Sequence, residues 1–139
     1  MGNGRKLSES FIHLGLGATA VPQPPFDGYE WYESYGARHA DDGREGRLVS
    51  FHRFTEGWDG WEMHPLGDEV VLCLAGAMVL TQEFPDGRRE VTRLSAGEYA
   101  INPPGVWHIA DVDGVAEALF ITAGEGTQAR SRAEFPVDE

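Results

Sequence analysis

The stretch "GWDGWEMHPLGDEVV" (57–71) places Glu62, His64 and Glu69 within eight residues. Side chains two residues apart on a strand point to the same face, so Glu62 and His64 share one face. The short turn "PLGD" (65–68) then returns the chain and puts Glu69 at the start of the next strand. We therefore expect two carboxylates and one imidazole to reach a single point.

A second stretch, "PPGVWH" (103–108), supplies His108 from a separate strand. Its two prolines stiffen the entry to that strand, which lowers the entropy cost of placing the imidazole. Nitrogen and oxygen ligands of this kind suit Mn, Fe, Ni, Co or Zn and leave coordination positions open for substrate or water. The predicted ligands of one divalent transition metal are Glu62, His64, Glu69 and His108.

The chain from Arg47 to Ala123 reads as a series of short strands. Eight runs rich in β-branched and aromatic residues are separated by Gly, Pro or Asp, with no helical pattern between them. In "FPDGRR" (84–89), Pro85 presets φ and Gly87 tolerates positive φ, which predicts a hairpin. Such spacing predicts an all-β sandwich or barrel. The runs are 47–54, 60–64, 69–76, 77–84, 89–94, 98–103, 107–112 and 116–123.

The remaining segments flank this predicted barrel, which we place at 47–123. Residues 1–46 form an N-terminal extension, with a short strand in "FIHLG" (11–15) and one short helix. The helix is expected within "DGYEWYESYGARHADDG" (27–43), capped by Asp27 and ended by Gly36. Residues 124–139 read as a polar tail. An aromatic stripe on the helix is expected to pack against the domain or a partner subunit: Tyr29, Trp31, Tyr32 and Tyr35.

Composition narrows the class of protein. A chain of 139 residues is one domain. Its 23 Asp and Glu against 11 Lys and Arg give a net charge of −12, which disfavours nucleic-acid and membrane partners. The sequence "ATA" (18–20) resembles a signal-peptidase site, but the apolar stretch before it is weak and broken by Gly and His. We expect a soluble cytoplasmic protein.

The first stretch resembles the first motif of the small single-domain cupins (cupin 2-like). That motif reads Gly, five residues, His, one residue, His, three or four residues, Glu, six residues, Gly. Here the same order is Gly57, Glu62, His64, Glu69 and Gly76, with four residues after the first Gly. Glu62 thus stands where the family has its first histidine.

The second stretch resembles the second cupin motif, which reads Gly, five residues, Pro, one residue, Gly, two residues, His, three residues, Asn. The matching positions are Gly97, Pro103, Gly105 and His108, while Val112 replaces the final Asn. Together the two motifs cover about residues 47–122. The resemblance implies a jelly-roll barrel with a divalent metal inside it.

Carried over to this chain, the resemblance puts His64, Glu69 and His108 at ligand positions. A divalent cation with two carboxylates and two neutral imidazoles is formally neutral, which removes the cost of facing Glu62 with Glu69. The additional carboxylate favours Fe or Mn, with Ni, Zn and Co also possible. The alternative is a metal-free barrel in which Glu62 is protonated or paired with Arg53.

Three classes of function are consistent with these residues. The favoured one is a small metalloenzyme of the dioxygenase, isomerase or lyase class, acting on a small oxygen-bearing organic substrate. Glu62 would then complete the metal shell or act as the catalytic general base. The others are a non-catalytic cupin that binds or senses a carbohydrate or carboxylate, and a metal-free scaffold. The outward apolar side chains of 70–74 favour a homodimer.

Other side chains receive weaker interpretations. His52 either lines the barrel mouth or packs, and Phe120 is either a pocket wall or a core residue. Cys73, the single cysteine, shares the face of Glu69 and is expected to be a small buried residue. His13 and His39 lie in loop-like segments and are assigned no role.

Overall fold

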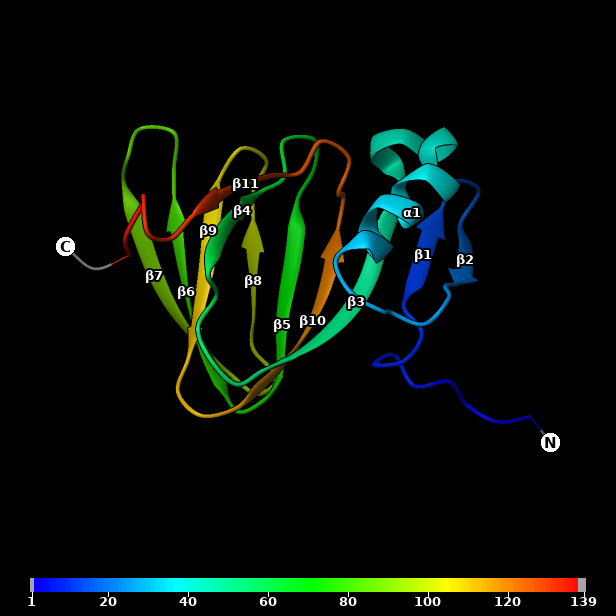
Figure 1. The fold of residues 1–139 in the computed structure, drawn as a ribbon, viewed down its shortest axis with the longest axis horizontal. Coiled ribbons are helices and arrows are strands. Elements are labelled where there is room, and N and C mark those ends of the chain that lie inside the picture. The colour runs from blue at the N-terminus through cyan, green and yellow to red at the C-terminus, as the bar shows by residue number, and fades with distance from the viewer. Residues whose placement is uncertain (1, 138–139) are drawn as a thin grey trace.

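The computed structural model describes residues 2–137 and consists of two antiparallel sheets packed face to face (Figure 1). The six-stranded sheet has the order β2(Thr19–Pro22), β1(Ile12–Gly15), β3(Arg47–Phe54), β10(Ala116–Thr122), β5(Glu69–Ala75), β8(Tyr99–Asn102). The five-stranded sheet has the order β11(Gln128–Ser131), β4(Gly60–Met63), β9(Trp107–Val112), β6(Ala77–Glu83), β7(Arg89–Ser95).

The all-β prediction is confirmed, since each of the eight predicted runs coincides with one strand from β3 to β10. The predicted hairpin joins β6 to β7, with the Gly87 amide donating to the Phe84 carbonyl over 2.8 Å. Gly87 has a φ of 87°, as this turn requires. The pattern of short apolar runs in the sequence was therefore sufficient to predict these eight strands.

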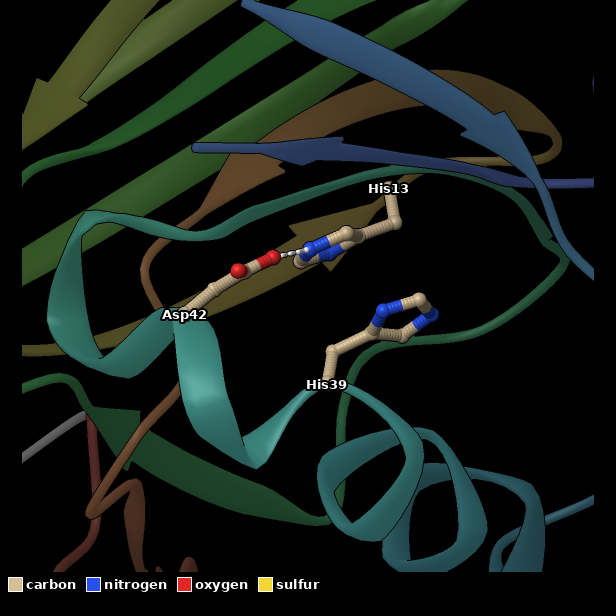
Figure 2. Close-up of side chains that lie close together, drawn as sticks. All are labelled: His13, His39 and Asp42. Carbon is tan, nitrogen blue, oxygen red and sulfur yellow. Dashed lines mark hydrogen bonds and ion pairs between the residues drawn. The ribbon is translucent and has the colours of Figure 1, made fainter. Parts of the chain in front are cut away.

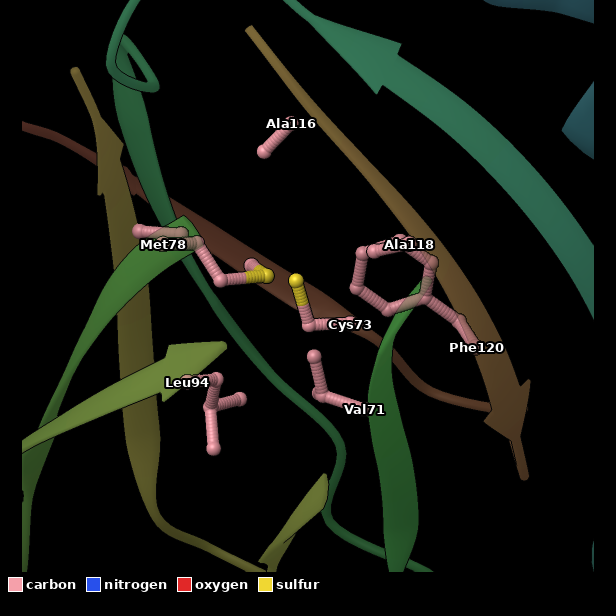
Figure 3. Close-up of a cluster of buried hydrophobic side chains, with 8 residues drawn as sticks. Val71, Cys73, Met78, Leu94, Ala116, Ala118 and Phe120 are labelled. Atoms are coloured by element: carbon pink, nitrogen blue, oxygen red, sulfur yellow. The ribbon is translucent and has the colours of Figure 1, made fainter. Parts of the chain in front are cut away.

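The main core lies between the two sheets. Eight side chains form this cluster (Figure 3), and both Cys73 and Phe120 belong to it. Cys73 is fully buried, so the expectation of a small buried residue is confirmed. Phe54 and Trp58 pack against the same cluster. The eight members are Val71, Cys73, Met78, Leu94, Ala110, Ala116, Ala118 and Phe120.

A second, smaller core holds the N-terminal segment against the six-stranded sheet. Strands β1 and β2 continue that sheet beyond β3, and helix α1(Glu30–Arg38) lies beside them (Figure 1). Trp31 on the helix packs with Phe11 and Leu48. The predicted short helix is therefore present, but its ends differ from the prediction.

The predicted helix ends were wrong because local signals were outweighed by packing. No side chain caps the helix, so Asp27 does not have the expected role. The helix continues through Gly36 to Arg38, because Trp31 and Tyr35 anchor both of its turns in the smaller core. A 3-10 helix, η1(Ala40–Glu45), follows directly.

Part of the segment interpreted as a polar tail forms strand β11, which pairs with β4. Beneath it lies Trp61, fully buried, with its indole N–H donating to the Phe135 carbonyl over 2.7 Å. The guanidinium groups of Arg89 and Arg130 lie 5.0 and 4.5 Å from the Trp61 ring. β11 therefore closes the edge of the five-stranded sheet. Within residues 2–137, no helix is both long and apolar enough to cross a membrane.

Candidate metal centre

The predicted metal ligands come from two rows of side chains on facing sheets. In the five-stranded sheet, Glu62 on β4 lies directly opposite His108 on β9, and His108 lies opposite Gln82 on β6. In the six-stranded sheet, Glu69 on β5 lies between Asn102 on β8 and Thr122 on β10. Residues paired in this way project from the same face of a sheet.

All four predicted ligands approach one another. Glu62, His64 and His108 each offer one ligand atom, and these atoms lie within 4.8 Å of one another. Glu69 Oε2 is 3.1 Å from His64 Nε2, and Glu69 Oε1 is 3.1 Å from His108 Nε2. Glu62 Oε2 lies 3.9 Å from His64 Nε2. This cluster, Glu62, His64, Glu69 and His108, is called the barrel cluster below.

Hydrogen bonds on the far side of each imidazole determine which ring nitrogen carries the proton. The Thr127 hydroxyl donates to the Gly124 carbonyl over 2.7 Å, so at 2.8 Å it accepts from His64 Nδ1. His108 Nδ1 faces the Val106 carbonyl at 3.4 Å, and a carbonyl only accepts. In both neutral imidazoles Nδ1 is therefore protonated and Nε2 carries the lone pair.

Two lone pairs thus face one buried carboxylate. His64 Nε2 and His108 Nε2 are both buried and make no hydrogen bond within the described part of the chain. Lone pairs at 3.1 Å from carboxylate oxygens repel unless a positive charge lies between them. The cation is either an extra proton on an imidazole or a metal ion, and the donor set fits a divalent transition metal.

Glu69 is held in place by neutral donors. The Asn102 amide donates to Oε1 over 3.0 Å, and the Thr122 hydroxyl donates to Oε2 over 2.6 Å. Gln82 in turn donates to the Asn102 side-chain oxygen over 2.8 Å, which orients that amide. Burial opposes ionisation, but His108 and His64, when protonated, donate toward the carboxylate and hold the pKa of Glu69 well below its usual range. Glu69 is therefore a fixed carboxylate.

The metal-free His64 imidazole attracts a proton. Although burial lowers the pKa of His64, the Glu69 carboxylate 3.1 Å away and then the charge of Glu62 raise it overall. Protons and a metal ion compete for the same Nε2 atom.

Glu62 differs from the other three because it reaches solvent. Its side chain is 48% exposed, against 4% for His64 and Glu69 and 1% for His108. Partial withdrawal from water and then the charge of Glu69 raise its pKa. Within residues 2–137 no ion pair joins it to Arg53, which lies across from Glu117 on β10. Glu62 therefore borders the open side of the cluster.

The sequence did not reveal that α1 contributes to this open side. The Tyr32 hydroxyl is 2.8 Å from His52 Nε2, and His52 also packs against Phe120 and Phe54. Burial first, and then the charges of Glu62 and Glu69, raise the pKa of the Tyr32 hydroxyl above its usual range. Only the aromatic spacing in "YEWYESY" could have indicated a helix here, and it could not indicate what the helix faces.

Aromatic rings continue from His52 to the buried imidazoles. Phe54 and Phe120 both pack against Trp58, whose ring meets His108 edge-on with centroids 6.3 Å apart. The Trp58 indole N–H is buried and has no hydrogen-bond partner in the described structure. The barrel cluster is thus flanked by the aromatic part of the main core, which holds one donor without a partner in the described structure.

Comparison with known proteins finds similarity in fold. No family model and no curated protein matches the sequence. An oxalate oxidase aligns over 66% of this chain and 50% of its own, with 17% identity and a TM-score of 0.55. Peruvianin-I, a cysteine peptidase from Thevetia peruviana latex, aligns over 61% and 56%, with 20% identity and a TM-score of 0.52. A double-stranded β-helix protein from Klebsiella pneumoniae aligns over 61% and 73%, with 22% identity and a TM-score of 0.50.

The chain has a cupin fold. Cupin-2 and cupin superfamily proteins are also among the matched structures. The chain spans about half the length of the oxalate oxidase and of Peruvianin-I. At these identities the comparisons establish the architecture, and the chemistry has to be argued from the residues.

Proposed function

We propose that this cupin is a metalloprotein that holds one divalent transition metal per chain in the barrel cluster. The observation that carries the proposal is the pair of buried Nε2 lone pairs of His64 and His108, each 3.1 Å from an oxygen of Glu69. Their outer nitrogens are held by Thr127 and by the Val106 carbonyl. Such outer hydrogen bonds are typical of metal-binding histidines.

We further propose that the metal serves catalysis, in an enzyme of the dioxygenase, isomerase or lyase class. A bound Fe, Mn or related ion supplies Lewis acidity, or redox chemistry where the element permits it. The chain supplies a base: Glu62 is half-exposed at the edge of the cluster, where its carboxylate can accept a proton from a substrate. Asn102 and Thr122 already donate hydrogen bonds to Glu69 and hold it in place. Glu62 is therefore the carboxylate that can change from metal ligand to general base.

The substrate that suits this open side is a small organic molecule with an oxygen donor and an apolar or planar part. The Trp58 ring lies edge-on to His108, and its buried N–H, without a partner in the described structure, is available to donate to a substrate oxygen. The Tyr32 hydroxyl, held by His52, adds a polar contact near Glu62. One similar fold is named an oxalate oxidase, which agrees with an oxygen-bearing substrate without selecting the reaction.

Metal analysis of untagged protein tests the proposal most directly. We expect the barrel cluster to account for close to one equivalent of a divalent transition metal, with Fe or Mn favoured because two carboxylates make the site hard. His108→Ala should lose this metal, because His108 is fully buried and nothing else in its row replaces the imidazole. Glu62→Gln should retain the metal and lose turnover of any substrate found by screening.

Two results would count against this function. Protein prepared without added chelator that holds no metal, and whose stability is unchanged by added Fe²⁺, Mn²⁺, Ni²⁺ or Zn²⁺, would contradict the metal centre. A metal equally retained in His108→Ala would place it elsewhere. Glu117→Gln, a change on β10 outside the cluster, controls for the loss of one carboxylate. A sizing measurement of the same preparations tests the expected homodimer.

A further inference from the structure

Outside the barrel cluster, a second group of potential ligands lies under the N-terminal helix. His13 comes from β1, His39 follows the last residue of α1, and Asp42 lies in η1 (Figure 2). Each offers one ligand atom, and the three atoms lie within 4.8 Å of one another. His13 is 2% exposed, and the other two are partly buried. This group, His13, His39 and Asp42, is called the N-terminal cluster below.

The hydrogen bonds of the N-terminal cluster assign its protons. His13 Nε2 donates to Asp42 Oδ2 over 2.6 Å, because a carboxylate only accepts, and Nδ1 then accepts from the Tyr35 hydroxyl at 2.6 Å. His39 Nε2 lies 3.1 Å from Gln23 Oε1, an amide oxygen that also only accepts. His39 Nδ1 is therefore left with a lone pair.

The surrounding backbone approaches the cluster closely. A Cβ atom on Gly46 would lie 2.9 Å from His13 Cε1 and 3.0 Å from Asp42 Cβ. A Cβ atom on Gly15 would lie 2.8 Å from Asp42 Oδ2. Only glycine fits at these two positions without displacing the cluster, so the chain is built around His13 and Asp42. The group is thus enclosed from two sides, unlike a chance gathering of surface residues.

We propose that the N-terminal cluster binds a divalent transition metal of the Zn²⁺ type through His13 Nε2, His39 Nδ1 and Asp42 Oδ2. Two imidazoles and one carboxylate are a preferred donor set for such ions and a poor one for Mg²⁺ or Ca²⁺. The outer nitrogens already have partners, Tyr35 for His13 and Gln23 for His39, as metal-binding histidines require.

Binding changes the protonation and the ring geometry in a defined way. The ion takes the place of the proton on His13 Nε2, and that proton moves to Nδ1, which then donates to the Tyr35 oxygen. Charge balances, because the neutral imidazole only changes tautomer. The His13 and His39 rings are stacked with centroids 3.8 Å apart and an angle of 18°. His39 must rotate out of the stack, because two nearly parallel rings cannot both point at one ion about 2 Å from each nitrogen.

The consequence of such an ion would be structural. It would join β1, the end of α1 and η1 at one point, and these elements otherwise meet the barrel through the smaller core around Trp31. Because α1 also carries Tyr32, whose hydroxyl lies 2.8 Å from His52 Nε2, ordering this segment would fix that hydroxyl.

Titration of untagged, chelator-stripped full-length protein with Co²⁺ tests the proposal, followed by absorbance and calorimetry, with Zn²⁺ as competitor. The two proposals together predict two ions per chain. His39→Ala and Asp42→Asn should each weaken one of them at least tenfold, and His108→Ala should remove the other. Asp41→Asn, a neighbouring exposed carboxylate, is the matched control and should change neither.

The outcomes separate the two sites. One Co²⁺ that survives in His108→Ala and is lost when His39→Ala is added supports the N-terminal cluster, whatever the barrel cluster binds. Equal stoichiometry and affinity in the wild type, His39→Ala and Asp42→Asn would overturn the inference, even if His108→Ala confirmed the barrel cluster. Because His39 is partly exposed, its variant should fold, and the far-ultraviolet circular dichroism spectrum checks this.

Discussion

The barrel cluster and the N-terminal cluster each take one residue from the same row of the six-stranded sheet, yet they treat their imidazoles differently. Strand pairing runs from Glu69 to Thr122, from Thr122 to Leu48, and from Leu48 to His13. Glu69 and His13 therefore project from the same face, three strand spacings or roughly 14 Å apart. One sheet thus contributes Glu69 to a group between the sheets and His13 to a group under α1.

The difference lies in which hydrogen bonds are already made. In the barrel cluster, Thr127 and the Val106 carbonyl take up the Nδ1 protons, so both Nε2 lone pairs face Glu69. In the N-terminal cluster, His13 donates its Nε2 proton directly to Asp42. The barrel cluster therefore needs an added proton or metal ion between its imidazoles and Glu69. In the N-terminal cluster the hydrogen bond from His13 to Asp42 forms without any added cation.

The largest difference between the clusters should appear when each loses its carboxylate charge. Glu69→Gln removes the counter-charge for a metal ion or a protonated imidazole, and it places amide hydrogens against one of the two donors, Asn102 or Thr122. We expect a loss of about 3 kcal/mol of stability, the range for breaking a buried charge pair, together with loss of the barrel metal. Asp42→Asn keeps a hydrogen-bond acceptor for His13, and should cost only about 1 kcal/mol.

Urea unfolding with and without a chelator measures both effects. In the presence of chelator the two variants should still differ in free energy of unfolding. The reason is that replacing Glu69 removes interactions within the protein, in addition to any with a metal. Equal losses in the two variants would show that the contrast between the clusters is incorrect. Glu117→Gln again provides the reference for an outlying carboxylate.

A smaller effect is expected from the outer hydrogen bond alone. Thr127→Val removes the acceptor of the His64 Nδ1 proton while keeping the shape of the side chain. His64 can then adopt the other tautomer, and metal affinity should fall by about 10- to 100-fold, as for other residues that orient metal ligands. Competition with a coloured chelator measures this, with Thr92→Val on β7 as control. An unchanged affinity would mean that Thr127 does not set the tautomer.

The sequence was sufficient to predict that the four side chains of the barrel cluster would lie close together, but not which residues hydrogen-bond to them. Because side chains two residues apart on a strand share a face, Glu62 and His64 lie on the same side regardless of how the other strands are arranged. The roles of Thr127 and Gln82, in contrast, depend on which strands become neighbours, and β11 lay in a segment interpreted as a tail. Register between distant strands is not encoded in any local pattern.

The N-terminal cluster was missed for a related reason. His13 and His39 are 26 positions apart and come from a strand and a helix end. Their meeting depends on the helix continuing past Gly36, which follows from the packing of Trp31 and Tyr35 and not from any capping signal. Local rules ended the helix two residues too early, and so gave no reason to consider His39.

The ion pairs that hold β11 beside the barrel cluster should give the smallest effect, and it should depend on pH. Glu83 Oε2 is 2.7 Å from Arg130 on β11, and Oε1 is 3.0 Å from Arg89. Burial opposes ionisation of Glu83, but these two guanidinium groups lower its pKa overall.

Because the folded pKa of Glu83 is below the unfolded value, its contribution is present above about pH 4.3 and is lost as the pH falls through the folded pKa. Glu83→Gln should therefore be less stable than the wild type by about 1 kcal/mol at pH 7, with the gap closing below pH 4. Urea unfolding of both proteins from pH 7 to pH 3 measures the gap, and Glu90→Gln, at an exposed ion pair with Arg88, is the control. A stability difference that stayed constant with pH would show that β11 is held by the rings around Trp61 and not by the Glu83 carboxylate. The hydrogen bond from His64 to Thr127 would then not depend on the ionisation of Glu83.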